Sequence, residues 1–378
     1  EVQGGSDVGK NACRAVRADD GSYRIWGEKW FCSNIDADVF LMTARFGEEV
    51  EGTSGLGLFF VPRQLDDGSV NNFEIRRLKD KIGTRTMASA ECDFEGAHAY
   101  HMGAEEDGFK NMMNYVINTS RLWNAVACIG SARRSYVTGQ SYAEFREAFG
   151  RPILQYPLIQ ETLADMKAEL DASVSGTIHM VGLQDRKDAG QTSDAEEQFF
   201  RMALNLNKVR TAKLARWAAV QGIEVLGGNG AIETFSVLPR LLRDSIVTEN
   251  WEGTHNTLQM QIMRDMQKYR LHEGFFAYLR ELTAEVRPAD EPLAETVQQG
   301  LGEAIEKLAE LPELDEGAAT LVMRPLMDRL AYLMYAAVRL WERGNHDEDD
   351  PIDRASLEHF VATRLGDERD RSSGAYLD

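Results

Sequence analysis

The chain has 378 residues, of which 43% are hydrophobic and 27% charged, an ordinary balance for a globular protein with room for more than one domain. It contains no run of about 18 apolar residues, so we expect no membrane-spanning helix. The net charge of −19 at pH 7 argues against a nucleic-acid partner, because phosphate contacts need Lys and Arg.

Residues 1 to about 104 are predicted to form a β domain. Aromatic and β-branched residues, punctuated by turn residues, fill "GSYRIWGEKWFCSN" and "ADVFLMTARF", and similar short segments follow up to "ASAECDFEGAHAYHMG". This short spacing is typical of a sandwich or barrel. The segment "GTSGLGLFF" fits a turn that enters a strand, and it lacks the context of a dinucleotide fingerprint.

Long helices are predicted over the next part of the chain, where apolar residues recur at helical spacing. The expected helices cover 109–145, 157–185, 195–225, 237–246 and 256–270. A β domain followed by a bundle of long helices predicts an α+β fold made of segregated blocks.

A further helical segment is predicted over 271–378. Its stretches "RPADEPLAE" and "LPELDEG" are expected to be linkers, and the apolar pattern of "LVMRPLMDRLAYLMYAAVRLW" predicts a helix buried on a broad face. The segment holds about twice as many acidic as basic residues, which again opposes DNA binding.

Glu252 is the most informative single residue. It lies in "DSIVTENWEGTHNTLQ" (244–259), just before the last helix of the bundle, which Thr254 or Asn256 is expected to cap. A carboxylate there is favoured by the helix dipole whatever the protein does, so the structural interpretation has the larger prior, as it has for Glu249. The geometry also suits chemistry, because backbone N–H groups at a helix start can hold an oxyanion beside a base.

Other motifs also have ordinary explanations when taken alone. "VLGGNGAIE" (225–233) fits a helix C-cap or a backbone that approaches a flat or phosphorylated ligand. Trp30 fits a core strand, and "FREAFGRP" (145–152) fits a helix end with solvated Arg. The four Cys and seven His lack zinc-ligand spacing. We therefore expect reduced thiols, no metal site and a cytoplasmic protein.

Five motifs in chain order resemble the successive signatures of the acyl-CoA dehydrogenase family: "EVQGGSD", "KWFCSN", "FREAFGRPILQYPLIQETLADM", "VLGGNGAIE" and "LPRLLRDSIVTENWEGTHN". The tail resembles only the AidB-like branch, which has an extra C-terminal helical domain. The resemblance implies a middle β-sandwich or barrel domain (1–104), a C-terminal four-helix bundle (105–270) and an additional helical domain (271–378). It also implies that an N-terminal helical domain is missing, so we expect the chain alone to be inactive or poorly flavinated.

The resemblance also assigns roles residue by residue. Glu252 in "WEGT" matches the catalytic base. The positions matching FAD contacts are Ser6, Trp30, Cys32, Ser33, Arg146, Phe149, Gly227, Gly228, Thr254 and Asn256. The positions matching substrate contacts are Ser6, Arg121 and Gly253.

The implied reaction is the dehydrogenation of a fatty acyl-CoA, as in β-oxidation. Glu252 would remove the α-proton while the β-hydrogen passes as hydride to flavin N5, which gives a trans-2-enoyl-CoA. The family passes the electrons to an electron-transfer flavoprotein. We therefore expect an FAD-dependent oxidoreductase that forms a homodimer or homotetramer.

Three departures from the family pattern affect individual contacts. Cys32 replaces a Thr that bonds to the flavin, Asn118 replaces an Asp of the CoA adenine contact, and Glu224 replaces a Gln that precedes the glycine pair. Ser120 occupies the position of the base in some long- and branched-chain members, so Glu252 has no rival.

Two functions from other classes remain as alternatives. One is an alkylation-response flavoprotein with weak dehydrogenase activity and a nucleic-acid or stress role. The other is a non-catalytic helical scaffold. The acidic tail argues against the first, and Glu252 argues against the second.

Overall fold

The computed structural model describes residues 2–46, 52–346 and 349–366. The chain divides into two compact units, Glu1–Ser120 and Arg121–Asp378. Across the described residues, no helix combines the length and the apolar character needed to span a membrane.

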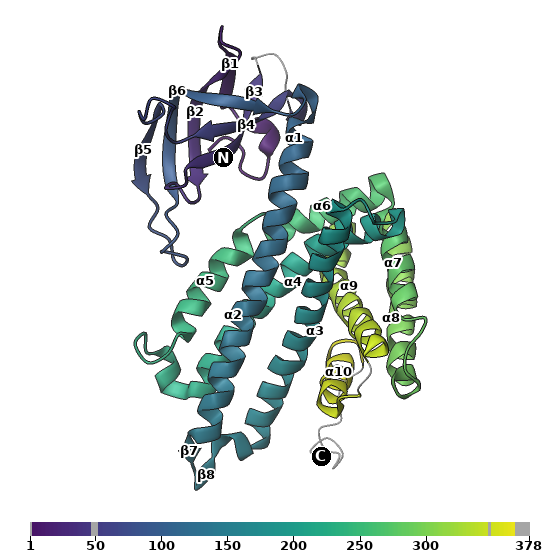
Figure 1. The fold of residues 1–378 in the computed structure, drawn as a ribbon. Coiled ribbons are helices and arrows are strands. Elements are labelled where there is room, and N and C mark those ends of the chain that lie inside the picture. The colour runs from purple at the N-terminus through teal and green to yellow at the C-terminus, as the bar shows by residue number, and fades with distance from the viewer. Residues whose placement is uncertain (1, 47–51, 347–348, 367–378) are drawn as a thin grey trace. The chain divides into compact units, whose positions relative to one another are not determined.

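The first unit is built on a six-stranded sheet that closes on itself (Figure 1). Its strands are β1 (Arg14–Arg17), β2 (Tyr23–Cys32), β3 (Val39–Phe46), β4 (Leu56–Pro62), β5 (Phe73–Leu78) and β6 (Ala90–Met102). The strand order is β2-β1-β3-β4-β6-β5, and β6 also pairs with β2. Five strands therefore form a closed barrel, and β5 extends it along β6. The predicted β domain is confirmed.

The barrel interior explains why these segments form strands. Alternate residues of each strand point to one face of a sheet, and here they fill a core of Ile25, Phe59, Val61, Ala97 and Ala99. All five of these side chains are fully buried, alongside aromatic rings such as Tyr23. Closure also leaves β2 with no free edge against β6, which removes a site for unwanted strand pairing.

Four long helices form the bundle of the second unit. A short helix α1 (Gly108–Asn111) and a π-helical turn (Met112–Ile117) lead into α2 (Asn118–Phe145). The bundle continues with α3 (Pro157–Asp188), α4 (Asp194–Leu226) and α5 (Leu238–Asn250). Figure 1 shows α2 and α3 running alongside each other. Ala132, Met166, Leu214 and Leu238, one from each helix, meet in a common core.

The ends of α4 follow from local sequence. Ser193 caps the N-terminus in a reciprocal capping box with Glu196. At the other end Gly227 has φ 60°, so the helix stops at the glycine pair. The expected helices over 157–185 and 195–225 are therefore confirmed to within a few residues.

The remaining helices are α6 (His255–Tyr269), α7 (Leu271–Leu282), α8 (Glu291–Glu310), α9 (Glu316–Asn345) and α10 (Pro351–Arg364). The expected apolar helix is α9, whose Met334, Tyr335 and Val338 are fully buried in a core shared with α3 and α4. The linker prediction for "RPADEPLAE" is wrong in its second half, because α8 starts at Glu291. Pro292 lies in the first turn, where a helix tolerates proline.

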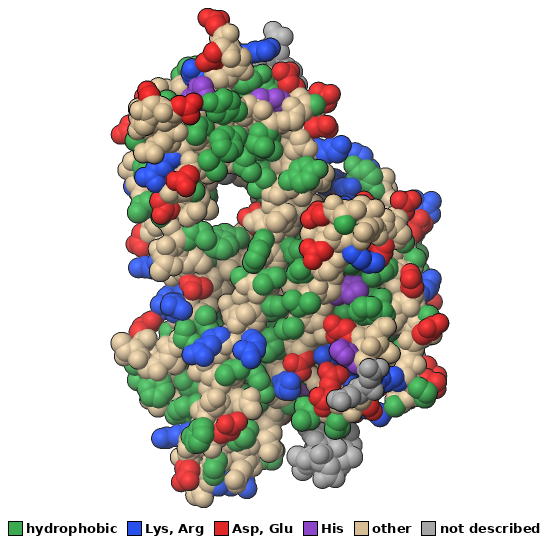
Figure 2. Space-filling model, viewed as in Figure 1, with side chains coloured by type: hydrophobic (Ala, Val, Ile, Leu, Met, Phe, Trp, Pro, Cys, Tyr) green, Lys and Arg blue, Asp and Glu red, His purple; other side chains and the backbone are tan. Residues whose placement is uncertain are grey.

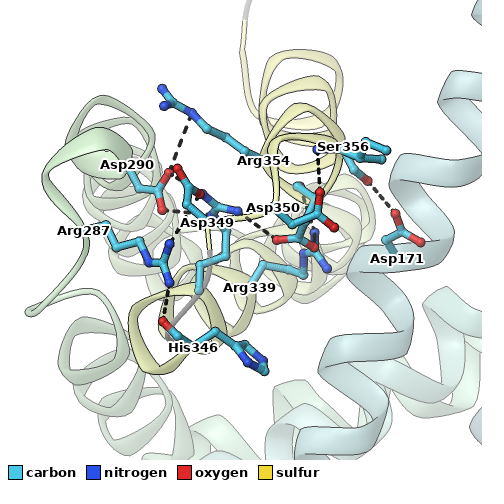
Figure 3. A network of polar contacts seen from close by, with 12 residues as sticks. Asp171, Arg287, Asp290, Arg339, His346, Asp349, Asp350, Arg354 and Ser356 are labelled. Carbon is cyan, nitrogen blue, oxygen red and sulfur yellow. Dashed lines mark hydrogen bonds and ion pairs between the residues drawn. The ribbon is translucent and has the colours of Figure 1, made fainter.

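A network of ion pairs around the buried Arg343 and Asp290 joins the N-cap of α8 to α9 and α10. Figure 3 shows the residues around Asp290, Arg339 and Asp349. Arg343 of α9 donates from Nε to Asp290 Oδ2 at 2.9 Å and from Nη1 to Asp353 Oδ2 at 2.9 Å. Its side chain is 4% exposed and that of Asp290 is 0% exposed. These contacts fix the three helices to one another.

Seven short 3₁₀ turns and one small hairpin complete the described elements. The turns are Val8–Lys10, Thr53–Gly55, Glu105–Asp107, Ile153–Gln155, Gly227–Ala231, Pro288–Asp290 and Leu311–Glu313. The hairpin pairs β7 (Glu147–Ala148) with β8 (Arg151–Pro152).

Candidate active site

The turn between α5 and α6 carries Glu252. α5 ends at Asn250, Trp251 is its C-cap, and Thr254 caps α6 by accepting a hydrogen bond from the Thr257 N–H. Of the two expected capping residues, Thr254 and Asn256, it is Thr254 that caps the helix. Glu252 has φ 56°, a left-handed conformation that costs energy in a residue with a Cβ. Such strain persists only where the surroundings hold the backbone, and this is common at functional sites.

Gly253 makes the turn possible. Its φ is 105°, and a Cβ there would lie 3.1 Å from the Leu258 side chain. Only glycine meets both conditions without distortion. The Glu252 side chain is partly exposed, so a substrate could reach the carboxylate.

Arg121 of α2 holds the middle of this turn. The guanidinium donates from Nε to the Glu252 carbonyl at 3.1 Å and from Nη1 to Asn205 Oδ1 at 2.9 Å. Arg121 is 5% exposed. Burial lowers the pKa of Arg121 to about 10, and the nearby carboxylates of Glu252 and Asp265 oppose this shift. The structure therefore brings two of the predicted site residues, Arg121 and Glu252, into direct contact.

Lys208 of α4 holds both sides of the same turn. Its ammonium donates to the Glu249 carbonyl at 2.9 Å and to the Gly253 carbonyl at 2.8 Å. The side chain is fully buried. Burial lowers the pKa of Lys208 to about 8. A perturbed, buried cation next to a candidate base is a typical feature of a functional site.

The end of α5 is fastened to α2 by further polar contacts. Asn124 donates from its side-chain amide to the Thr248 carbonyl at 2.9 Å. Cys128 Sγ lies 3.4 Å from Thr248 Oγ1, and burial raises the pKa of this thiol to about 11. Cys128 is therefore a protonated packing residue and not a nucleophile.

Glu249 has the structural role that its position suggests. Its carboxylate accepts a hydrogen bond from Arg216 Nε at 2.8 Å. Burial alone would raise the pKa of Glu249, but contacts with His255 and Arg216 outweigh it and lower the pKa. The residue is an ionised ion-pair partner and is committed to Arg216.

One candidate residue, Arg146, lines a hollow of about 590 Å³ at the other end of the bundle. Arg146, Tyr142 and Phe235 contribute to its wall together with Leu226 and Asn229. Asn229 donates to the Tyr142 hydroxyl at 3.1 Å. An Arg, exposed main chain and aromatic rings suit a ligand that carries both phosphate and a flat ring.

The glycine pair stands next to this hollow. Gly227 and Gly228 are exposed, and a Cβ at either position would meet nothing within 4 Å. The backbone is therefore open to close approach by a ligand, as one of the two interpretations of this motif requires.

Phe149 lies at the tip of the small hairpin. Phe149 and Gly150 form its turn with φ 53° and 90°, and the Phe149 side chain is 96% exposed. The interpretation of "FREAFGRP" as a plain helix end is wrong, because the chain pairs Glu147 with Pro152 in a β-ladder. A two-residue hairpin turn of type I′ needs left-handed residues at both central positions, which are usually Asn or Gly. Phe at the first of these positions removes the usual sequence indication of a hairpin.

Asn256 lies apart from the turn contacts. It is exposed in the first turn of α6, where its side-chain oxygen accepts from Arg324 Nη2 at 3.4 Å.

The candidate residues of the first unit lie in two places. Trp30 and Cys32 are on β2, with Ser33 in the turn that follows. The interpretation of Trp30 as a core residue is wrong, because its side chain is exposed. Lys79 Nζ lies 3.3 Å from the centre of the Trp30 ring, and a hydrogen bond from Cys32 lowers the pKa of Cys92. Ser6 is exposed in a separate turn before the first 3₁₀ segment.

No group of His, Cys, Asp and Glu among the described residues has the arrangement of a metal site. Sequence reasoning missed three residues that support Glu252, namely Asn124, Asn205 and Lys208. A usable signal was present in "MALNLNKVRT" (202–211), where polar residues interrupt an apolar helix. Such residues are rarely buried without a partner.

Two family models match the chain. The acyl-CoA dehydrogenase middle domain matches residues 1–97, and the acyl-CoA dehydrogenase C-terminal domain matches residues 106–267. Acyl-CoA dehydrogenase family member 11 of Caenorhabditis elegans is 34% identical over 317 residues, which is 82% of this chain and 51% of that protein. AidB of Escherichia coli is 34% identical over 291 residues, 77% of this chain and 51% of that protein.

Solved structures agree with these matches. The crystal structure of Caenorhabditis elegans ACDH-11 in complex with C11-CoA superposes with a TM-score of 0.90 at 30% identity, over 98% of this chain and 64% of that one. The apo form of Bd2924 gives a TM-score of 0.78 at 26% identity, over 96% and 66% of the two chains. The present chain spans about half the length of the curated relatives named above. It belongs to the acyl-CoA dehydrogenase family.

Proposed function

We propose that the protein to which this chain belongs converts a fatty acyl-CoA to a trans-2-enoyl-CoA, with Glu252 as the acceptor of the α-proton. The observation that carries the proposal is the left-handed turn at Glu252. Two buried cations hold it, because Arg121 binds the Glu252 carbonyl and Lys208 binds the carbonyls of Glu249 and Gly253. This much support around one carboxylate is expected of a base whose position matters.

The chain's own part in the reaction is proton removal and substrate positioning. Glu252 takes the α-proton, and the electron pair of that C–H bond forms the new α,β double bond as the β-hydrogen leaves with its own electron pair. The α-proton is weakly acidic, so negative charge develops on the thioester oxygen and needs donors. The backbone N–H of Glu252 is one proposed donor, as the resemblance to the family implies.

FAD, when bound, supplies the oxidant that accepts the β-hydrogen as a hydride. The exposed glycines Gly227 and Gly228 would lie beside its adenine-dinucleotide portion. Arg146, which lines the neighbouring hollow, is proposed to reach the FAD of a second subunit. Phe149, nearly fully exposed on its hairpin, is proposed to reach the FAD of a second subunit in a homodimer or homotetramer. An electron-transfer flavoprotein is the proposed electron acceptor.

The substrate class is supported by the relative that was solved with an acyl-CoA. ACDH-11 was crystallised with C11-CoA, and it shares the fold of almost the whole of this chain. Arg121 and Gly253 are the proposed contacts near the thioester, and Ser6 is a further one.

An alkylation-response role that includes DNA binding is the weaker proposal. The likeness to AidB favours it. The tail is rich in acidic residues, however, and Figure 2 shows acidic and basic side chains interspersed over the helical unit, without a broad basic field on this face. A gel-shift assay at low salt tests this role, and tight binding would reverse the preference.

The dehydrogenase proposal is tested by reconstitution with FAD and a panel of acyl-CoAs. The chain is assayed as printed and also joined to the N-terminal helical domain that the resemblance implies. Loss of the flavin absorbance on adding acyl-CoA is the readout. Glu252→Gln should slow it by about 10²–10⁴-fold, the usual contribution of a positioned base.

Glu249→Gln provides the matched control three residues away, because Glu249 is already committed to Arg216. It should stay within about threefold of wild type, as expected of a group outside the chemistry. If Glu252→Gln reduced the flavin as fast as wild type, Glu252 would not be the base.

A further inference from the structure

Lys208 is a buried lysine in the middle of a helix core. Its side chain is fully buried, and its neighbours Val209 and Leu204 belong to the apolar core of α4. Moving an ammonium out of water is costly unless other groups replace its hydration. A residue that only fills this space would be Met or Leu, so the charge needs another explanation.

The contacts of Lys208 provide that explanation. Its two hydrogen bonds go to the carbonyls of Glu249 and Gly253, and these residues lie on either side of Glu252 in the chain. Glu249 belongs to the last turn of α5, where carbonyls lack helical partners and the helix dipole is negative. A cation is therefore attracted to this place, and it ties the helix end to the first residue after Glu252.

We propose that Lys208 is a positioning residue for Glu252, fixing the left-handed turn that presents this carboxylate. The inference rests on the proposed function, in which Glu252 accepts the α-proton. Lys208 reaches the turn from α4 and Arg121 reaches it from α2. The three main-chain carbonyls of Glu249, Glu252 and Gly253 are thus held from two sides.

Lys208 is the better of the two cations for a test of positioning. Arg121 is itself a predicted substrate contact, so its loss would mix binding with positioning. Lys208 has no exposed surface in the described structure, and it can act on substrate only through the turn. A displaced base lowers kcat, because a shift of about 1 Å can cost about 10²-fold in rate.

The charged and titratable groups that face Lys208 come from each element packed against it. Cys128 and Arg121 lie on α2, Glu249 lies on α5, and Glu252 lies in the turn. Glu249 and Glu252 favour the protonated amine, while burial and Arg121 disfavour it. At neutral pH the ammonium is charged. It loses its proton as the pH rises above about 8, which weakens its two hydrogen bonds.

The test compares Lys208→Met, Lys208→Gln and Lys208→Arg with Lys213→Met. Lys213 lies on the same helix, but its ammonium bonds to the Asp328 carboxylate on α9, at 2.9 Å to each oxygen. The first readout is hydrogen–deuterium exchange of the peptide covering 249–258, measured on the printed chain without cofactor. The second is kcat and KM for acyl-CoA in the FAD-loaded protein.

We expect Lys208→Met to expose the turn to exchange and to lower kcat by about 10–100-fold, with KM changed by less than about threefold. Lys208→Arg should restore part of the rate and move the alkaline fall in kcat to higher pH, because guanidinium keeps its proton. Lys208→Gln keeps amide donors without charge and should be intermediate. It also serves as the test variant if the Met variant does not fold.

Unchanged exchange in 249–258 with kcat within about threefold of wild type would overturn the proposal. Equal loosening by Lys213→Met would overturn it too, because the effect would then be general destabilisation. A failure of the proposed function is a separate result. In that case Glu252→Gln would keep wild-type flavin reduction, while the exchange experiment would still show whether Lys208 holds the turn.

Discussion

Two of the places where the described part of the helical unit buries a cation use the charge in opposite ways. In the tail, Arg343 pairs with the carboxylates of Asp290, Asp349 and Asp353. At the α5–α6 turn, Lys208 donates to main-chain carbonyls and not to carboxylates. In the tail network, each cation is neutralised by carboxylates. At the turn, the cation donates its hydrogen bonds to the dipoles of main-chain carbonyl groups.

The pKa values record this difference. Burial alone would lower the pKa of Arg343, but its hydrogen bonds to Asp290, Asp353 and Asp349 outweigh burial and raise the pKa. Burial lowers the pKa of Lys208 to about 8, because the opposing effects of Cys128, Glu252 and Glu249 compensate for it only in part. A fully paired charge stabilises a fold, whereas a charge left short of compensation is typical of a functional site. Burying the incompletely compensated charge of Lys208 lowers the stability of the protein, and it keeps Glu252 in place.

The largest expected effect on stability comes from breaking the tail network. Arg343→Met leaves Asp290, which is 0% exposed, without its main partner. We expect the free energy of unfolding to fall by about 3–5 kcal/mol, the usual cost of an uncompensated buried charge. Urea denaturation followed by circular dichroism measures it.

Arg354→Met is the control for this change. Arg354 also faces Asp290, at 4.0 Å, but its side chain is 37% exposed. It should cost less than about 1 kcal/mol. Equal costs for the two variants would show that the network has no special role in stability.

The second prediction concerns pH and the turn. The pKa of Lys208 in the folded protein is about 8, below its usual 10.5, so the unfolded chain binds more protons between these values. Stability attributable to Lys208 should therefore rise with pH across this window, by up to about 3 kcal/mol. The comparison is the difference in unfolding free energy between wild type and Lys208→Met at pH 7.5 and pH 10.5. If this difference in unfolding free energy stayed constant with pH, the pKa of Lys208 would not be lowered in the folded protein.

The smallest expected effect comes from Gly253→Ala. The new Cβ would lie 3.1 Å from Leu258 Cδ2 in a residue with φ 105°, so we expect a loss of about 1–3 kcal/mol. Gly182→Ala is the control, because a Cβ there meets nothing within 4 Å on helix α3. That change should be neutral or stabilising by up to about 1 kcal/mol. If both alanines were tolerated equally, the turn would be less constrained than its dihedral angles indicate.

The long helices could be predicted well, because their signals are local. Ser193 and Glu196 cap α4, and Gly227 ends it, as the sequence pattern indicates. The hairpin at Phe149 could not be predicted, since neither of its strands exceeds two residues. Closure of the barrel through β2 and β6 also escaped prediction. It joins segments far apart in sequence, such as Tyr23 and Ala99, and no periodicity encodes such a pairing.

The sequence by itself determined the α+β order, because helical and strand patterns depend on residue types at short spacing. The order of five motifs indicated the family, and only through that resemblance did Glu252 become the candidate base. Only the tertiary structure decided what holds that base. Arg121 and Lys208 come from helices far from Glu252 in the chain, and the carbonyls that they bind have no side-chain identity. A hydrogen bond to a main-chain carbonyl does not require a particular residue type at the accepting position. The contacts that support the turn therefore could not be predicted from sequence patterns and follow only from the packing of the helices.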